Sequence, residues 1–278
     1  MMSVREFVRQ RRALALAIIA AAILGVAATA WALYRGGPGS APEPTASASS
    51  RAEPTASPSV EPEPSSSEAP LGALVLTTAV DTLNVYDAPG DAEPSSTLGE
   101  WTAYGLPVTL LGTTTTDFDG QTWIRALLPV QPNGAAGWVR ASDVTVTSTT
   151  NAVHIYLDER LLEYTEDGVV SVSTTVAVGA PETPTPLGTF YVTDPLDLTT
   201  NPAGAYGAYA IGLSGYSDVL TEFAGGPPQI AIHGTNKPEL LGQAVSNGCI
   251  RISNDAILQI AATITLGTPV TIEATRTA

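Results

Sequence analysis

The one cysteine of this 278-residue chain, Cys249, lies in a hexapeptide that suits a thiol nucleophile. It follows Gly248 in the run Ser246-Asn247-Gly248-Cys249-Ile250-Arg251, between an expected turn and a short expected strand. Glycine lets a backbone approach a substrate closely and leaves N–H groups free to face a developing oxyanion. Because the N-terminus carries an export signal, described below, a lone reactive thiol favours a chemical role over simple space filling.

A thiol nucleophile needs a base or a positive neighbour to become a thiolate, and the chain has two histidines. His233 ends the apolar run 229–232 and precedes Gly234, which places it at the exit of an expected strand, where catalytic side chains commonly project. His154 lies inside an alternating strand, so it is interpreted as structural. The 16 positions between His233 and Cys249 are weak evidence by themselves.

Composition excludes several other classes of function. Twelve Lys and Arg against 27 Asp and Glu give a formal net charge of -15, and residues 1–35, with five Arg and one Glu, hold the basic excess. Such a chain is poorly suited to nucleic acid, whose phosphates must be neutralised. One cysteine excludes an intramolecular disulfide framework, and two histidines argue against a histidine-rich zinc site. No metal or organic cofactor is predicted.

The N-terminus, residues 1–35, reads as a cytoplasmic tip followed by a membrane anchor. Four arginines within residues 5–12 precede an uncharged stretch at 13–34, which is about 30 Å long as a helix. Basic residues resist translocation, so we expect the later domains to face the cell wall outside the membrane. Cleavage at Ala28-Thr29-Ala30 is the alternative and would give a secreted protein.

Residues 36–70 are predicted to be a disordered linker. They include eight Pro, nine Ser and five Glu and no aromatic residue, so they cannot bury enough surface to offset the entropy of ordering. A tether of this kind would let the following domains work at a distance from the membrane.

Residues 71–147 are predicted to form a small all-β barrel. Short apolar runs separated by turn dipeptides support this, and they fall at Ala73–Val80, Leu83–Tyr86, Gly105–Gly112, Thr122–Leu128 and Ala136–Val146. Leu83-Asn84-Val85-Tyr86, Asp119-Gly120 before Trp123, and Gly137-Trp138-Val139 resemble the bacterial Src-homology-three-like domain family. That resemblance implies a cell-wall ligand. The alternative is that the two tryptophans only pack.

Residues 150–278 are predicted to be mainly β with one helix. The helix is expected at Asp255–Thr265, with Ser253 or Asn254 as its cap. A hairpin turn is expected at Asp167-Gly168. The expected strands are Val153–Leu157, Arg160–Tyr164, Val169–Val178, Gly188–Thr193, Gln229–His233 and Pro269–Ala274.

Two motifs of this second unit resemble the L,D-transpeptidase catalytic domain. They are Ile232-His233-Gly234-Thr235-Asn236 and, after a spacer, Ser246-Asn247-Gly248-Cys249-Ile250-Arg251. Upstream, Thr183-Pro184-Thr185-Pro186-Leu187-Gly188 is similar to a further segment of that family. The resemblance covers about 125 residues. It implies a β-rich fold and a cysteine nucleophile that remodels peptidoglycan stem peptides.

The resemblance also implies roles for individual residues. Cys249 would attack the carbonyl after the third residue of a donor stem, expel D-alanine and be released by an acceptor amine, with His233 moving the protons. The Gly234 carbonyl would fix the imidazole tautomer, and N–H groups at Gly248 and Cys249 would face the oxyanion. The residues expected to contact substrate are Arg251, Ser246, Asn247, Thr235 and Asn236.

Two of these positions leave alternatives open. Arg251 could pair with a stem-peptide carboxylate in two-pronged geometry, or it could form a salt bridge on an acidic surface. Asn247 stands where most family members carry a second histidine, and an amide cannot take a proton. If that histidine mainly shapes the loop, Asn247 is an adequate replacement. If that histidine lowers the thiol pKa, Asn247 cannot do so, and this protein would be slower or inactive.

The sequence therefore predicts a membrane-anchored transpeptidase that cross-links peptidoglycan stems. One alternative is an L,D-carboxypeptidase, in which water releases the acyl-enzyme. The other is a catalytically weak cell-wall-binding protein built from the barrel and a degenerate enzyme.

Overall fold

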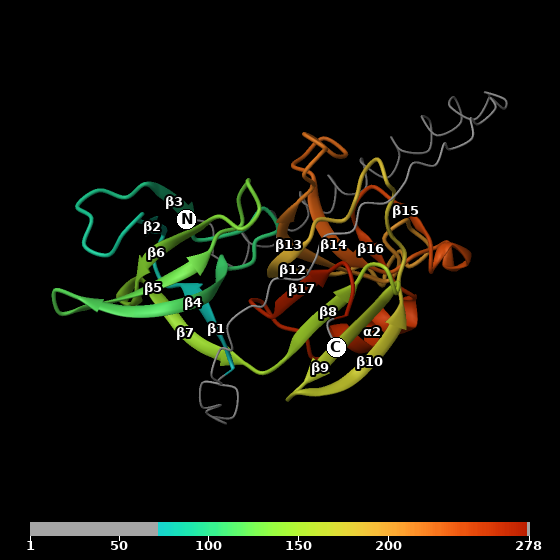
Figure 1. Cartoon of the computed structure of the whole chain (residues 1–278), viewed down its shortest axis with the longest axis horizontal. Helices are drawn as coiled ribbons and strands as arrows, with labels where there is room; N and C mark the ends of the chain where they lie inside the picture. The colour runs from blue at the N-terminus through green and yellow to red at the C-terminus, as the bar shows by residue number, and fades with distance from the viewer. Residues whose placement is uncertain (1–71, 277–278) are drawn as a thin grey trace, which may run out of the picture.

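The structure, a computed structural model, describes residues 72–276, and these residues fold mainly into β-strands (Figure 1). The predicted membrane anchor and linker, residues 1–70, lie outside the described part. Within residues 72–276, no helix is both long enough and apolar enough to span a bilayer.

The first part of the chain forms a five-stranded sheet in the order β6-β5-β4-β1-β7, with β2 and β3 as a separate pair. Asp119 and Gly120 make the β4–β5 turn, and both have positive φ, as the turn prediction requires. These elements are β1 (Ala73–Thr78), β2 (Thr82–Val85), β3 (Ser96–Gly99), β4 (Thr109–Phe118), β5 (Gln121–Leu127), β6 (Ala136–Arg140), the 3₁₀ turn η1 (Ala141–Asp143) and β7 (Val144–Thr149).

Three expectations for this part were wrong. The run expected at 136–146 is two strands, because η1 turns the chain between β6 and β7 and lets β7 pair with β1. β4 begins later than expected and continues to Phe118, since its polar half still pairs with β5. The strand β3 was not expected, because its residues are mostly exposed and polar.

The two tryptophans of the expected barrel motifs occupy different positions. Trp123 is only 2% exposed and meets the Tyr86 ring edge-on, with 5.1 Å between ring centroids. The Arg140 guanidinium lies over both rings. Trp138 is half-buried and pairs with Tyr86 through the backbone. Trp123 is therefore a packing residue, as one alternative predicted, and the cell-wall ligand and the Src-homology-three-like resemblance remain predictions.

The second part of the chain forms an eight-stranded sheet in the order β10-β9-β8-β17-β12-β13-β14-β16, and a two-stranded pair, β11 and β15. Figure 1 shows this sheet beside the first one, with α2 against it. Its elements are β8 (Ala152–Tyr156), β9 (Leu161–Glu166), β10 (Val169–Thr175), β11 (Val178–Gly179), β12 (Gly188–Asp197), β13 (Tyr209–Tyr216), β14 (Gln229–His233), the 3₁₀ turn η2 (Pro238–Leu240), β15 (Ala244–Ser246), β16 (Ile250–Arg251), α2 (Asn254–Ala261) and β17 (Pro269–Glu273).

The strand expected at Val169–Val178 is wrong, because β10 ends at Thr175 and Val178 begins β11 in a different sheet. The other expected strands are present, with changes at their ends. The hairpin at Asp167-Gly168 joins β9 to β10, and both residues have positive φ. β12 runs four residues past its expected end, to Asp197. Among the described residues, β13 is the longest strand that the sequence did not predict, because glycine, alanine and serine make up half of it and hide the alternation.

Helix α2 covers one face of the sheet. Ser253 is its N-cap, and the Ser253 side chain accepts a hydrogen bond from the Ala256 N–H. The helix ends at Ala261, four residues before its expected end, because Thr263 and Thr265 are β-branched and the Thr265 and Thr268 hydroxyls hold a turn there. Ile257 and Ile260 are fully or almost fully buried against the strands, where they complete the main hydrophobic core.

Polar contacts fasten the two sheets to each other. The Asn133 side chain donates to the Tyr216 carbonyl at 2.7 Å and accepts from the Tyr216 N–H at 2.9 Å, as a paired strand would. The Tyr216 and Tyr191 hydroxyls donate to the carbonyls of Pro129 and Leu127. These bonds fix the first sheet over one end of the second.

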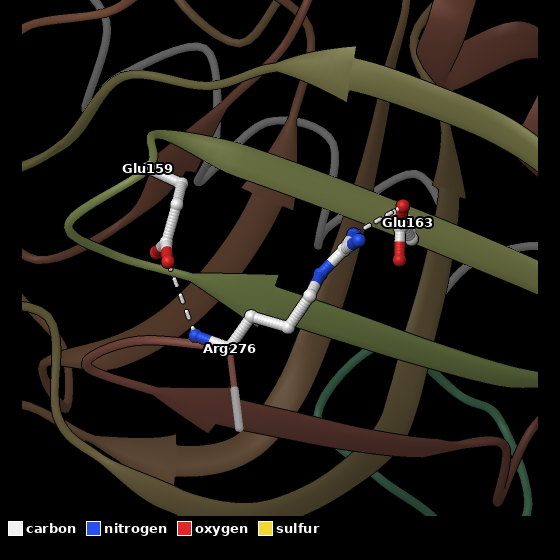
Figure 2. Close-up of polar contacts among 3 residues, drawn as sticks. All are labelled: Glu159, Glu163 and Arg276. Carbon is white, nitrogen blue, oxygen red and sulfur yellow. Dashed lines mark hydrogen bonds and ion pairs between the residues drawn. The ribbon is translucent and has the colours of Figure 1, made fainter. Parts of the chain in front are cut away.

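The end of the chain is also fastened. Arg276 forms an ion pair with Glu163 on β9, and its N–H donates to the Glu159 carboxylate (Figure 2). The Arg276 guanidinium also lies over the Tyr156 ring. This contact holds the segment after β17 against β8 and β9.

The packing of α2 predicts a large difference between neighbouring residues. Ile257→Ala should lower the free energy of unfolding by about 2–5 kcal/mol, because it leaves a cavity under the helix. Leu258→Ala is the matched control, since Leu258 is 41% exposed, and it should cost under about 1 kcal/mol. Urea unfolding followed by circular dichroism measures both. Equal costs would contradict the placement of this helix.

Candidate active site

Strands β14 and β16 bring the two reactive side chains together. They pair in parallel, with Ile232 opposite Ile250 and His233 opposite Arg251. Opposed residues of neighbouring strands project from the same face of a sheet, so the Cys249, Arg251 and His233 side chains share one face. The other face holds Ile232 and Ile250, which are buried in the core.

The His233 imidazole is held in one orientation. Its side chain is 4% exposed, and Nδ1 lies 2.6 Å from the Gly234 carbonyl oxygen. A carbonyl only accepts, so Nδ1 carries the proton and Nε2 has the free lone pair of a base. Burial lowers the His233 pKa to about 4; the Gly234 bond opposes this change, and the positive charge of Arg251 adds to it.

The Cys249 thiol stays protonated in the free protein. Burial of the sulfur raises its pKa, while a backbone hydrogen bond at Ala231 and the positive charge of Arg251 act in the opposite direction. With a neutral imidazole beside it, the site at neutral pH holds a thiol and a free base.

Tyr206 is a site residue that the sequence did not reveal. Its ring centroid lies 4.7 Å from that of His233, and the two rings are tilted by 58°. Burial raises the Tyr206 pKa to about 12, and the nearby Cys249 contributes to this increase. The segment 198–208 has no regular element, so no sequence pattern placed this tyrosine beside the histidine.

The turn before Cys249 depends on Gly248 and Ser246. Gly248 has φ near 110°, and a Cβ there would lie 2.9 Å from the Ile230 side chain. The buried Ser246 hydroxyl donates to the Cys249 carbonyl at 2.5 Å and accepts from the Gly248 N–H at 3.1 Å. The expectation for the Gly248 N–H is thus not met, because that group faces Ser246. Asn247 is exposed at the tip of the turn.

The threonine-proline segment, residues 183–186, holds this turn through hydrogen bonds to its backbone. The Thr185 hydroxyl donates to the Gly248 carbonyl at 2.8 Å and accepts from the Gly179 N–H at 2.9 Å. The Thr183 hydroxyl donates to the Ser246 carbonyl at 3.0 Å. In the sequence, this segment stands out only through its resemblance to the family. Its threonines position the backbone that carries Cys249.

The loop after His233 is held in the same way. Thr235 is buried, and its hydroxyl accepts from the Lys237 N–H at 3.0 Å. The exposed Asn236 side chain donates to the Ala203 carbonyl. Asn254, which was considered only as a helix cap, accepts from the Thr235 N–H and the Ala208 N–H. Thr235 and Ser246 therefore have structural contacts where substrate contacts were expected.

Arg251 lies beside the thiol without an acidic partner. No carboxylate in residues 72–276 forms a salt bridge with its guanidinium, and its buried Nε has no hydrogen-bond acceptor there. This arrangement argues against the surface salt bridge and leaves the guanidinium available for an anionic ligand.

Cys249 lies at one end of a cavity of about 420 Å³. Its floor is the face of β12, β13 and β14 opposite the core. Residues of the β3–β4 and β5–β6 loops, with Thr109 of β4, form a wall. The lining is mostly apolar, with Asp194 as its one acidic residue. Within residues 72–276, no group of three or more His, Cys, Asp or Glu side chains could hold a metal ion.

Comparisons with known proteins identify the fold around this site. Residues 150–272 match the model of the L,D-transpeptidase catalytic domain. The chain is 30% identical to the YkuD protein of Bacillus subtilis (strain 168) over 153 residues, which are 53% of this chain and 84% of that protein. It is 32% identical to the YkuD protein of Bacillus licheniformis over 161 residues, which are 55% of this chain and 88% of the relative. The chain belongs to the L,D-transpeptidase family.

Solved L,D-transpeptidases are more distant in sequence. One from Mycobacterium tuberculosis H37Rv aligns with 58% of this chain and 97% of its own, at 14% identity and a TM-score of 0.38. The family assignment therefore comes from the two curated relatives, each matched over most of its length.

The buried imidazole of this L,D-transpeptidase predicts a loss of stability in acid. An unfolded histidine binds a proton below about pH 6.5, but folded His233 does so only near pH 4, so stability is lost as the pH falls through this window. When the pH falls from about 7 to about 4.5, the free energy of unfolding of the unmodified protein should decrease by about 2 kcal/mol more than that of His233→Gln. Urea titrations at both pH values measure this difference. His154→Gln is the control and should keep the pH dependence of the unmodified protein. If His154→Gln removes this pH dependence as His233→Gln does, the effect does not come from His233.

Proposed function

We propose that this chain is a membrane-anchored L,D-transpeptidase that cross-links peptidoglycan stem peptides outside the cytoplasm, through an acyl-enzyme on Cys249. The observation that carries the proposal is the placement of Cys249 and His233 on one face of the sheet, with Cys249 lining a cavity large enough for a peptide. Membership of the family supports the class of reaction.

The residues supply each proton movement of an acyl transfer. Nε2 of His233 takes the Cys249 proton as sulfur attacks the donor carbonyl, and the imidazolium then protonates the departing D-alanine amine. The acceptor amine attacks the thioester, gives a proton to His233, and releases the sulfur as a thiolate, which regains a proton. The Gly234 carbonyl stabilises the imidazolium between these steps.

The anionic groups of the reaction meet Arg251 and the backbone at Cys249. The Gly248 N–H is already bonded to Ser246, so the Cys249 N–H is the donor that faces the developing oxyanion. The Arg251 guanidinium pairs with a stem carboxylate and favours the thiolate over the thiol. Asn247, exposed at the tip of the turn, contacts the donor stem.

The uncharged segment 13–34 places the enzyme at the cell membrane, with its later domains facing the wall. The linker 36–70 gives the reach to stems that lie away from the bilayer. Residues of the first part of the chain, among them Tyr104 and Pro129, line the cavity. This part of the chain therefore helps to shape the site.

The decisive experiment is incubation of the full chain with tetrapeptide-bearing muropeptides. Cross-linked dimers should form with the unmodified chain and be absent with Cys249→Ala, because the acyl-enzyme needs the sulfur. Liquid chromatography with mass spectrometry measures them. Release of D-alanine without dimers, even with added acceptor amine, would indicate the carboxypeptidase. Wall binding unchanged by Cys249→Ala, with no product from either chain, would indicate the binding protein.

Arg251→Gln should reduce kcat/KM for the donor stem about 10–100-fold, because a charge-assisted contact is lost. The reduction should be much smaller for a donor whose stem carboxylate is amidated. Arg125→Gln, an exposed arginine on β5, is the control and should keep the rate. Equal losses with both donors would show that Arg251 acts on the thiol alone.

A further inference from the structure

The cavity beside Cys249 contains a buried carboxylate that the acyl-transfer mechanism does not use. Asp194 on β12 is 4% exposed and lines the cavity. The Thr102 hydroxyl, from the loop between β3 and β4, donates to its Oδ1 at 2.6 Å. No Lys, Arg or His nitrogen in residues 72–276 forms a salt bridge with it. A buried anion without a positive partner is costly unless a ligand supplies one.

The surroundings of Asp194 suit a cation. Tyr104 and Tyr216 line the same cavity, and the Asp194 charge, after burial, raises the pKa of both hydroxyls. Tyr206 and Phe223 bring the aromatic rings of the lining to four. Aromatic faces attract ammonium groups, and a carboxylate among them supplies the opposite charge. An anionic ligand group would be repelled by this carboxylate, and an apolar group would leave it without a positive partner.

The sheet fixes where this carboxylate lies relative to the sulfur. Asp194 is opposite Gly212, and Gly212 is opposite Ala231. Extending the β14–β16 register by one residue brings Cys249 beside Ala231, whose backbone it contacts through a hydrogen bond. Members of one row share a face. Three strand spacings separate the ends of the row, which is about 14 Å. The two residues between them are small, so the row is an open floor along which a substrate side chain can lie.

We propose that Asp194, with Thr102 and the rings of Tyr104 and Tyr216, binds a side-chain ammonium of the donor residue whose carbonyl Cys249 attacks. A straight diamino acid places its distal nitrogen about 7 Å from its own carbonyl carbon. With a reacting contact of about 3 Å at the sulfur and a charge-assisted hydrogen bond of about 3 Å at Asp194, this length spans the row. The ammonium bound at Asp194 is not the acceptor amine, because the acceptor amine must reach the thioester on Cys249.

This inference rests on the proposed function for the substrate, and it assigns specificity to both sheets. Thr102, in the loop between β3 and β4, donates a hydrogen bond that orients the Asp194 carboxylate. The subsite is therefore incomplete without the first part of the chain. The Asn133–Tyr216 bonds keep the two sheets in the position that the subsite needs.

The test measures binding in the full chain carrying Cys249→Ala, so that it does not depend on turnover. The probes are three tetrapeptides that differ only at their third residue: L-lysine, Nε-acetyl-L-lysine and L-norleucine. Isothermal titration calorimetry should give at least tenfold tighter binding of the lysine peptide than of the other two. Adding Asp194→Asn should remove that preference, and adding Thr102→Val should reduce it.

Asp197→Asn is the matched control, because Asp197 is an exposed carboxylate on the same strand and outside the cavity lining. It should keep the preference for lysine. Equal binding of the lysine and acetyl-lysine peptides would overturn the subsite, and this comparison needs no variant at Asp194 to fold. Failure of the enzyme itself is seen separately, as absence of D-alanine release by the chain with Cys249 intact.

Discussion

The parallel pairing of β14 with β16 is the constraint on which the site depends. Two short strands, of five and two residues, set the histidine and the cysteine on one face while their apolar neighbours enter the core on the other. A shift of one residue in this register would turn the thiol into the core and the isoleucines into the cavity. The hydrophobic burial of Ile232 and Ile250 thus stabilises the catalytic geometry.

Around this pairing, the loops are held by side chains that bond to backbone groups. Thr185 and Ser246 fix the turn of the nucleophile, and Asn254 joins the loop after the histidine to the chain at Ala208. Each bond satisfies a backbone group that a buried irregular loop would otherwise leave without a partner. Preorganisation of this kind places reactive groups without further loss of entropy when substrate binds.

The sequence predicted most strands, because alternation is a local signal, and it singled out Cys249 and His233, which the β14–β16 pairing brings to one face of the sheet. It did not predict β13, whose Gly212 is needed for space beside Asp194 and carries no strand signal. Asp194 itself fell beyond the expected end of its strand, and its partner Thr102 is 92 positions away. Contacts of that separation depend on how the two sheets pack, which no local pattern contains.

The resting state of the thiol has a consequence for the lifetime of the protein. Peroxide and disulfide oxidants react with thiolates far faster than with thiols, and oxidation beyond the sulfenic acid is not reversed. The raised pKa of Cys249 favours the thiol, which should make the one sulfhydryl of the chain less sensitive to oxidants than a free thiolate. In the proposed reaction a bound stem peptide would promote formation of the thiolate, so protection from oxidants and catalysis would depend on the same partly buried sulfur.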